Sequence, residues 1–163
     1  MKKMLIIGAG GHGQVLAEAA RACGYGEIDF LDDRNPVAIG GTDRLEALAG
    51  GYDGAIVSIG NNALRRDFIR RLQAAGANVA TLVHPRAYVA PSAALGAGCV
   101  VLPGAVVHTN ARVGEGCIVS IGAMIDHDAR VEDFSHVNAG AVVPAGARAS
   151  GRVAPGAVAR QEN

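Results

Sequence analysis

Two histidines in the C-terminal half of the chain have the residue types and neighbours that suit acid–base chemistry. The run Asp126-His127-Asp128 places an imidazole between two carboxylates, and His136 follows nine residues later. A neutral histidine is the natural general base near neutral pH, and a neighbouring carboxylate raises its basicity. A lone surface histidine is more often without a catalytic role, but this arrangement predicts that His127 removes a proton from a nucleophile.

A glycine-rich turn near the N-terminus is the second stretch with chemical meaning. Residues 8–13 read G-A-G-G-H-G, which matches the pattern G-x-G-x-x-G directly after a predicted buried strand at residues 3–7. Asp32 and Asp33 follow about 20 residues later, as in folds that bind dinucleotides. Such glycines let backbone N–H groups approach a phosphate at the N-terminus of a helix. Taken alone, the motif leaves NAD open as the ligand.

The elements that would position the glycine turn alternate between strand and helix patterns. Helices are expected at residues 14–23, 43–49 and 63–75, and strands at residues 3–7, 27–31, 52–59 and 79–83. In the last helix, Leu64, Phe68 and Leu72 would form the apolar face, with Arg65 and three other arginines largely on the opposite face. Residues 1–84 are therefore predicted to form an α/β Rossmann-like half-domain, half the size of a full dinucleotide-binding fold.

The elements that would position the histidines belong to a six-residue repeat. Eleven apolar residues are spaced six apart from Val89 to Ala149, and a small residue precedes each of them by two positions. Three positions after most of them stands Gly, Asn or Asp, which tolerate the positive φ of a tight turn. A helix of period 3.6 cannot keep this pattern on one face, and a flat strand requires alternation. The repeat predicts an all-β left-handed parallel β-helix over residues 85–152.

The repeat loses its register after Ala149. The next aliphatic position is Pro155, which cannot donate to a strand ladder, and Val153 and Val158 are out of phase. We therefore expect an irregular C-terminal tail over residues 153–163.

The spacing of the two histidines bears on assembly. Nine residues is half of a coil of three hexads, so His127 and His136 should point to different sides of one column. The two histidines would share a site only where the β-helices of two subunits meet. The spacing predicts an oligomer with sites between subunits, and a homotrimer is the usual assembly of hexapeptide helices.

Composition excludes several classes of function. Fifteen basic residues balance fifteen acidic ones, which gives no electrostatic reason to expect binding to nucleic acid or to a membrane surface. No apolar run approaches the roughly 18 residues of a membrane span. The first apolar run breaks at Gly8, too early for a signal peptide, so we expect a cytoplasmic protein. Two separated histidines are too few ligands for a metal, and we expect no metal site.

Several short motifs, in their order and spacing, resemble the bacterial nucleotide-sugar acetyltransferases of the left-handed β-helix superfamily. They are GAGGHG at 8–13, FLDD at 30–33, SIGNN at 58–62, LVHP at 82–85, IDHD at 125–128 and FSHV at 134–137. This family includes enzymes that acetylate the 4-amino group of a UDP-4-amino-sugar on the way to diacetylbacillosamine, and the sialic acid O-acetyltransferases. The resemblance extends to about Val153.

The resemblance implies direct acetyl transfer from acetyl-CoA to the amine of a UDP-4-amino-sugar. His127 would be the general base, Asp128 the acidic residue that tunes it, and His136 a contact to acetyl-CoA. A UDP pyrophosphate suits the glycine turn better than NAD does, because the half-domain lacks a second mononucleotide-binding half. The positions that match the UDP-sugar site are Gly10, Gly11, His12, Asp32, Asp33 and Gly60.

Two alternatives stay open. The same base would serve an alcohol, so O-acetylation of a sialic acid-type sugar is a second hypothesis. Family members continue for further coils that help to hold acetyl-CoA, and the present sequence departs from the family pattern there. We therefore expect part of the donor site to be missing, and a non-catalytic trimer that binds only a nucleotide sugar is the third hypothesis.

Overall fold

The computed structural model describes residues 1–160, and the chain divides into two compact units between Ala80 and Thr81. The sequence predicts this division four residues later, after residue 84. The difference arises because β4 (Leu82–Val83) pairs with β7 (Val100–Val101) in the second unit, whereas the sequence pattern assigns it to the first sheet.

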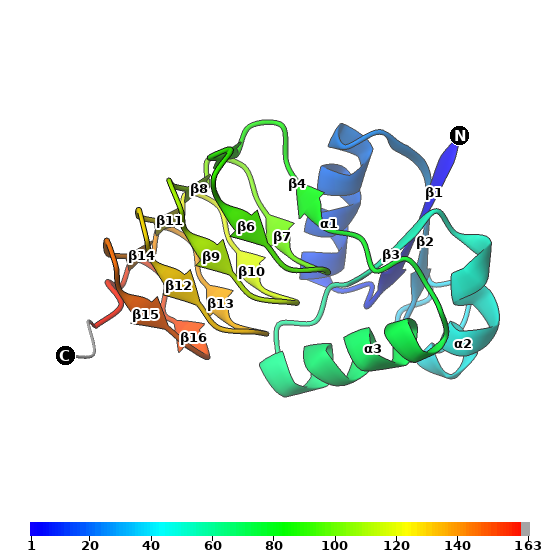
Figure 1. Ribbon diagram of the computed structural model, residues 1–163. Helices are drawn as coiled ribbons and strands as arrows, with labels where there is room; N and C mark the ends of the chain where they lie inside the picture. The colour runs from blue at the N-terminus through cyan, green and yellow to red at the C-terminus, as the bar shows by residue number, and fades with distance from the viewer. Residues whose placement is uncertain (161–163) are drawn as a thin grey trace. The chain divides into compact units, whose positions relative to one another are not determined.

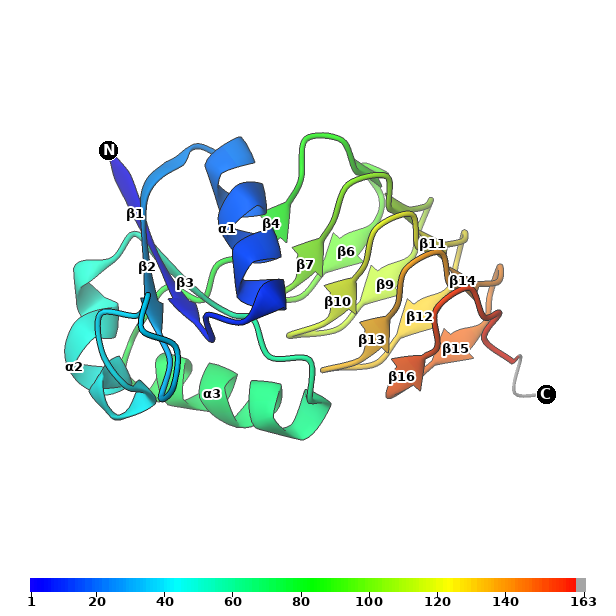
Figure 2. The same ribbon diagram turned by 180° about the vertical axis from the view of Figure 1, so that it is seen from behind.

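The first unit is a three-stranded parallel sheet with helices on both faces (Figure 1, Figure 2). Its main elements are β1 (Lys2–Ile7), α1 (Gly11–Ala22), β2 (Tyr25–Leu31), β3 (Gly54–Val57) and α3 (Asn62–Ala74). Between β2 and β3 lie three short helical turns, η1 (Thr42–Arg44), α2 (Leu45–Leu48) and η2 (Ala49–Gly51).

The strand order β2-β1-β3 places β1 at the centre of this sheet. Its last four residues, Met4 to Ile7, are fully buried, as an apolar run between two neighbouring strands requires. Val79 adds an isolated bridge to Ala55, so the strand predicted at residues 79–83 contributes one residue pair to this sheet and ends as β4 in the second unit.

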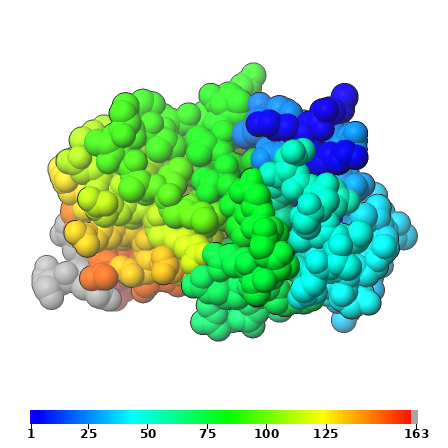
Figure 3. Space-filling model, turned by 45° about the vertical axis from the view of Figure 1, so that its right-hand side comes forward, coloured from blue at the N-terminus to red at the C-terminus, as the bar shows by residue number. Residues whose placement is uncertain are grey.

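The second unit is a parallel β-helix whose strands are two residues long. In addition to β4 and β7, they are β5 (Tyr88–Val89), β6 (Ala94–Leu95), β8 (Val106–Val107), β9 (Arg112–Val113), β10 (Ile118–Val119), β11 (Met124–Ile125), β12 (Arg130–Val131), β13 (His136–Val137), β14 (Val142–Val143), β15 (Arg148–Ala149) and β16 (Arg152–Val153). They form three sheets, β16-β13-β10-β7-β4, β14-β11-β8-β5 and β15-β12-β9-β6. Successive coils appear as bands from green to orange in Figure 3.

The interior of the β-helix is filled by the repeat positions that the sequence analysis singled out. Ile125 is fully buried and pairs with Val107 and Val143 in the neighbouring coils. The turn positions also behave as predicted, because Asn110 and Asp128 adopt positive φ angles of 59°. The predicted fold class, an α/β half-domain followed by a hexapeptide β-helix, is therefore confirmed.

Truncating Ile125 tests this inward packing. Ile125→Ala should lower the free energy of unfolding by about 2–5 kcal/mol, because the stacked neighbours cannot collapse into the cavity. Arg130→Ala is the matched control, since Arg130 lies outward on the next strand and is exposed. Urea denaturation measures both variants, and equal losses would contradict the assignment of inward and outward positions.

The expectation of an irregular tail from residue 153 needs correction. Val153 pairs with Val137, and Val158 forms a bridge with Val142. The residues of each pair are separated by two residues fewer than the 18 residues of a full coil. The reason is that the corner at Gly151, whose φ is 65°, is two residues shorter than the other corners. The repeat therefore continues in a shifted register through residue 158. Residues 161–163 lie outside the described part of the chain.

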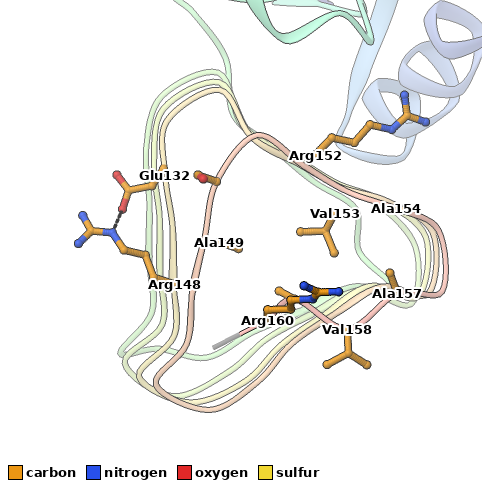
Figure 4. Close-up of a pocket in the computed structure, with 11 residues that line it drawn as sticks. Glu132, Arg148, Ala149, Arg152, Val153, Ala154, Ala157, Val158 and Arg160 are labelled. Carbon is orange, nitrogen blue, oxygen red and sulfur yellow. Dashed lines mark hydrogen bonds and ion pairs between the residues drawn. The ribbon is translucent and has the colours of Figure 1, made fainter. Parts of the chain in front are cut away.

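The last coil borders a hollow of about 610 Å³. In Figure 4, Val153 points into the triangular outline of the coils, whereas Arg148 lies outside it and pairs with Glu132. Ala149 and Ala157 also line this hollow. None of the residues predicted to do chemistry is among its lining residues, so the candidate site lies elsewhere.

Candidate active site

His127 lies at a corner of the β-helix, between β11 and β12, with its side chain 54% exposed. Its Nδ1 is 2.8 Å from Oδ2 of Asp128. The other oxygen of Asp128 accepts a hydrogen bond from the side-chain amide of Asn110, one coil earlier, at 3.2 Å. The carboxylate is thus held from two sides, and it orients the imidazole ring.

This pairing sets the protonation behaviour of the histidine. The hydrogen bond to Asp128 raises the pKa of His127 above its ordinary value of 6.5, and the same bond lowers the pKa of Asp128. When Nδ1–H is donated to the carboxylate, Nε2 carries the lone pair. The arrangement is that of an accessible general base with a raised pKa.

The preceding coil contributes a histidine that the sequence analysis did not single out. His108 Nδ1 lies 3.3 Å from Oδ1 of Asp126, and the rings of His108 and His127 meet edge-on with centroids 6.4 Å apart. A signal for this contact was present in the sequence. Positions 108 and 126 are 18 residues apart, which is one coil. The two residues therefore occupy equivalent positions on adjacent coils.

His136 lies on a different side of the β-helix. It lies on β13, and its Nε2 is 3.0 Å from the buried hydroxyl of Ser120. His127, in contrast, lies at the corner that precedes β12. The two histidines come from different sides of the column, as their half-coil spacing predicts.

In the first unit, the glycine turn joins β1 to α1. Gly10 caps the N-terminus of α1 and Gly11 is its first residue, and a Cβ atom at either position would meet open space. Gly13 is packed so tightly that a Cβ atom would lie 2.4 Å from the carbonyl oxygen of Gly8. The first N–H groups of a helix have no intrahelical partner, so this open turn suits a phosphate.

A buried arginine is hydrogen-bonded to Gly60 and acts on His12 through its charge. Arg65, in α3, is 1% exposed and donates hydrogen bonds to the carbonyl oxygens of Ile59 and Gly60. Burial, followed by the charge of Arg65, lowers the pKa of His12, whose Nε2 has no hydrogen-bond partner among residues 1–160. The prediction that Arg65 lies opposite the apolar face of its helix is wrong, because the loop carbonyls draw its side chain inward.

Asp32 and Asp33 accept hydrogen bonds from the protein's own backbone and side chains. Asp32 accepts the N–H of Ala9 through Oδ2 at 2.9 Å, and the N–H groups of residues 34 and 35 through Oδ1, which lowers the pKa of Asp32. Asp33 accepts hydrogen bonds from the backbone and hydroxyl of Thr42. Asp32 therefore anchors the glycine turn to the loop after β2.

Two further features of the described residues bear on function. No group of three or more His, Cys, Asp or Glu side chains there could hold a metal ion. Across the same residues, no helix is both long and apolar enough to cross a membrane.

Comparison with known proteins identifies the relatives of this chain. The model of the PglD N-terminal domain family matches residues 3–72. The acetyltransferase domain of PglB from Neisseria gonorrhoeae FA1090 is 41% identical, with a TM-score of 0.93, over 99% of this chain and 83% of that domain. The chain belongs to the left-handed β-helix nucleotide-sugar acetyltransferase family. The same PglB domain in complex with acetyl coenzyme A is 40% identical, with a TM-score of 0.92 over 98% of this chain and 82% of that one.

More distant family members extend the comparison. PerB from Caulobacter crescentus, in complex with CoA and GDP-perosamine, is 32% identical with a TM-score of 0.76, over 97% of this chain and 83% of that one. UDP-N-acetylbacillosamine N-acetyltransferase from Bacillus subtilis (strain 168) is 31% identical over 111 residues, which is 62% of this chain. The match spans about half of that curated relative, 51%. These relatives confirm the family that the sequence motifs suggested.

Proposed function

We propose that this family member transfers the acetyl group of acetyl-CoA to the amino group of a nucleotide-linked sugar, with a UDP-4-amino-sugar as the acceptor. The observation that carries the proposal is the contact of 2.8 Å between His127 and Asp128 at an exposed corner. The named activity of the Bacillus subtilis relative and the acetyl coenzyme A bound to the PglB domain support the two substrates.

The reaction needs one base and correct positioning. The amine nitrogen attacks the thioester carbonyl carbon, and Nε2 of His127 takes a proton from that nitrogen as the C–N bond forms. The resulting tetrahedral intermediate collapses, the C–S bond breaks, and the CoA thiolate takes up the proton. Asp128 stabilises the imidazolium while it carries that proton, and the products are the N-acetyl sugar and free CoA.

Each substrate is assigned to residues of one unit. We assign the nucleotide sugar to the open turn at Gly10, Gly11 and His12 and to the loop at Gly60, with Asp32 and Asp33 shaping the surrounding loops. We assign acetyl-CoA to the second unit, with His136 as one of its contacts. No metal ion is needed, because the base and the thioester supply the chemistry.

We further propose that the chain forms a homotrimer. The outward residues of one sheet form an apolar column, in which Tyr88 is 53% exposed and Met124 is 46% exposed. An exposed apolar patch of this kind marks an association surface. Sedimentation equilibrium measures the assembly directly. We place the reaction in the cytoplasm, where acetyl-CoA and nucleotide sugars are made.

Release of the free CoA thiol tests the proposed activity. We expect release that depends on both acetyl-CoA and a UDP-4-amino-sugar. Parallel reactions test two other acceptors. A GDP-linked amino sugar tests a different nucleotide, and a CMP-linked sialic acid tests the O-acetylation hypothesis. Isothermal titration with acetyl-CoA separates the non-catalytic hypothesis, because absent or millimolar binding would contradict the proposal.

Asp128→Asn should shift the acidic limb of the pH–rate profile to lower pH. The base acts in its neutral form, so the rate falls as the pH drops through the pKa of His127. Asp128 raises that pKa, so its loss moves the fall to lower pH. We also expect kcat at the optimum to fall by roughly 10-fold or more, because the ring loses its orienting partner. An unmoved limb would show that Asp128 does not tune the base.

A further inference from the structure

His108 is connected to the catalytic corner in two ways that the proposed mechanism does not use. Its Nδ1 lies 3.3 Å from Oδ1 of Asp126, and its ring meets the ring of His127 edge-on. The same oxygen of Asp126 accepts the backbone N–H of His127 at 2.7 Å. One carboxylate oxygen therefore joins the side chain of His108 to the main chain of the proposed base.

In the described part of the chain, the titratable groups that contact His127 come from its own corner and from the coil before it. Asp126 and Asp128 flank it on its own corner, and His108 faces it from the coil before. The coil that follows places the uncharged residues 144–146 beside it, where the N–H of Gly146 donates to the carbonyl oxygen of His127 at 2.9 Å. Of the described residues, His108 is a titratable side chain from another coil whose ring meets that of His127.

We propose that His108 is a positioning residue for the acetyl transfer, which holds His127 in place through Asp126. The inference rests on the proposed function. Asp128 and Asn110 fix the His127 ring on one side, whereas His108 and Asp126 fix the main chain and the edge of the ring on the other. Without His108, the Asp126 carboxylate loses the side chain that restrains it, and the ring of His127 loses the aromatic neighbour that limits its rotation.

The pair of His108 and Asp126 should also affect the basicity of His127. The negative charge of Asp126 raises the pKa of His127, and the hydrogen bond of His108 to that carboxylate lowers the pKa of Asp126. We expect this hydrogen bond to weaken the effect of the Asp126 charge on His127. Removing His108 should therefore move the acidic limb of the rate profile to higher pH. Asp126→Asn should move it to lower pH, and opposite shifts are not expected from general damage to the fold.

A double-mutant cycle on the full-length protein tests the positioning role. His108→Ala should lower kcat by about 10-fold with little change in either KM, because misplacing a catalytic group costs rate and leaves ground-state binding intact. His108→Asn keeps a donor for Asp126 and should restore most of the rate. In the Asp126→Asn background, His108→Ala should have little additional effect, because the two residues act as one unit. His84→Asn, on a turn outside the site, is the matched control.

The outcomes separate this inference from the proposed function. Inactive wild-type protein, or full activity in His127→Ala, would overturn both. If His127→Ala is inactive but His108→Ala keeps the wild-type rate and pH limb, only the role of His108 is overturned. Additive losses in the double mutant would also overturn it. Thermal melts accompany each variant. If His108→Ala is destabilised, His108→Leu takes its place in both backgrounds, because leucine keeps a bulky side chain but has no donor for Asp126, and the same non-additivity is expected.

Discussion

Replacing His127 with alanine should lower kcat for acetyl transfer by about 100-fold to 10,000-fold, the range typical for loss of a positioned general base. In the proposed mechanism the imidazole takes the proton from the attacking amine, and Asp128 holds its ring through the contact of 2.8 Å. Steady-state kinetics with saturating acetyl-CoA measure the loss.

Two controls accompany this variant. Acetyl-CoA should bind to His127→Ala with its wild-type affinity in isothermal titration, because the side chain acts on the acceptor amine. The exposed position of His127 predicts an unchanged melting temperature. A kcat within about threefold of wild type would contradict the role of His127, because even a modest general base contributes more than that.

Replacing Gly13 with alanine should destabilise the first unit by about 1–3 kcal/mol and weaken binding of the nucleotide sugar. Alanine in a helix is normally favoured over glycine by up to about 1 kcal/mol. Here the new methyl group would lie 2.4 Å from the carbonyl oxygen of Gly8, so α1 must move away from β1. Hydrogen exchange of the β1 amides in the full chain measures the loss.

Two other glycines provide matched controls. Gly11→Ala adds a methyl group that meets open space, so it should keep the exchange protection of β1 and lose affinity only for the nucleotide sugar. Gly50→Ala also meets open space, far from the turn in sequence, and should change neither property. If Gly11→Ala binds the nucleotide sugar as wild type does, the assignment of the phosphate to this turn is wrong.

The β-helix could be predicted from sequence because its period repeats without a gap. Each inward position follows from the one before, so Ile125 and Val143 are identified as core residues by counting alone. Counting also explains the error at Val153, because a corner that is two residues shorter shifts the register. Arg65 shows a different limit. Its burial depends on loop carbonyls that no helical pattern reveals.

The candidate site was predictable where its residues are neighbours in sequence. His127 and Asp128 are adjacent, and the structure joins them. The side-chain contacts of His108 and Asn110 were not predicted, although each residue precedes its partner by one coil. The repeat was used to predict core packing and turn conformation, and not contacts between the side chains of stacked turns. Asp32 is the opposite case. Its sequence motif matched it to the substrate site, but its carboxylate already accepts hydrogen bonds from three backbone N–H groups.

Tracing the acetyl group itself tests the proposed activity most directly. Acetyl-CoA labelled with ¹³C in the acetyl group is incubated with the protein and a UDP-4-amino-sugar, and the products are followed by NMR. We expect the label to appear in an amide on the sugar, in step with release of CoA, for the wild-type chain and far more slowly for His127→Ala. Label found only in free acetate, or no transfer by the wild-type chain, would contradict the proposed function.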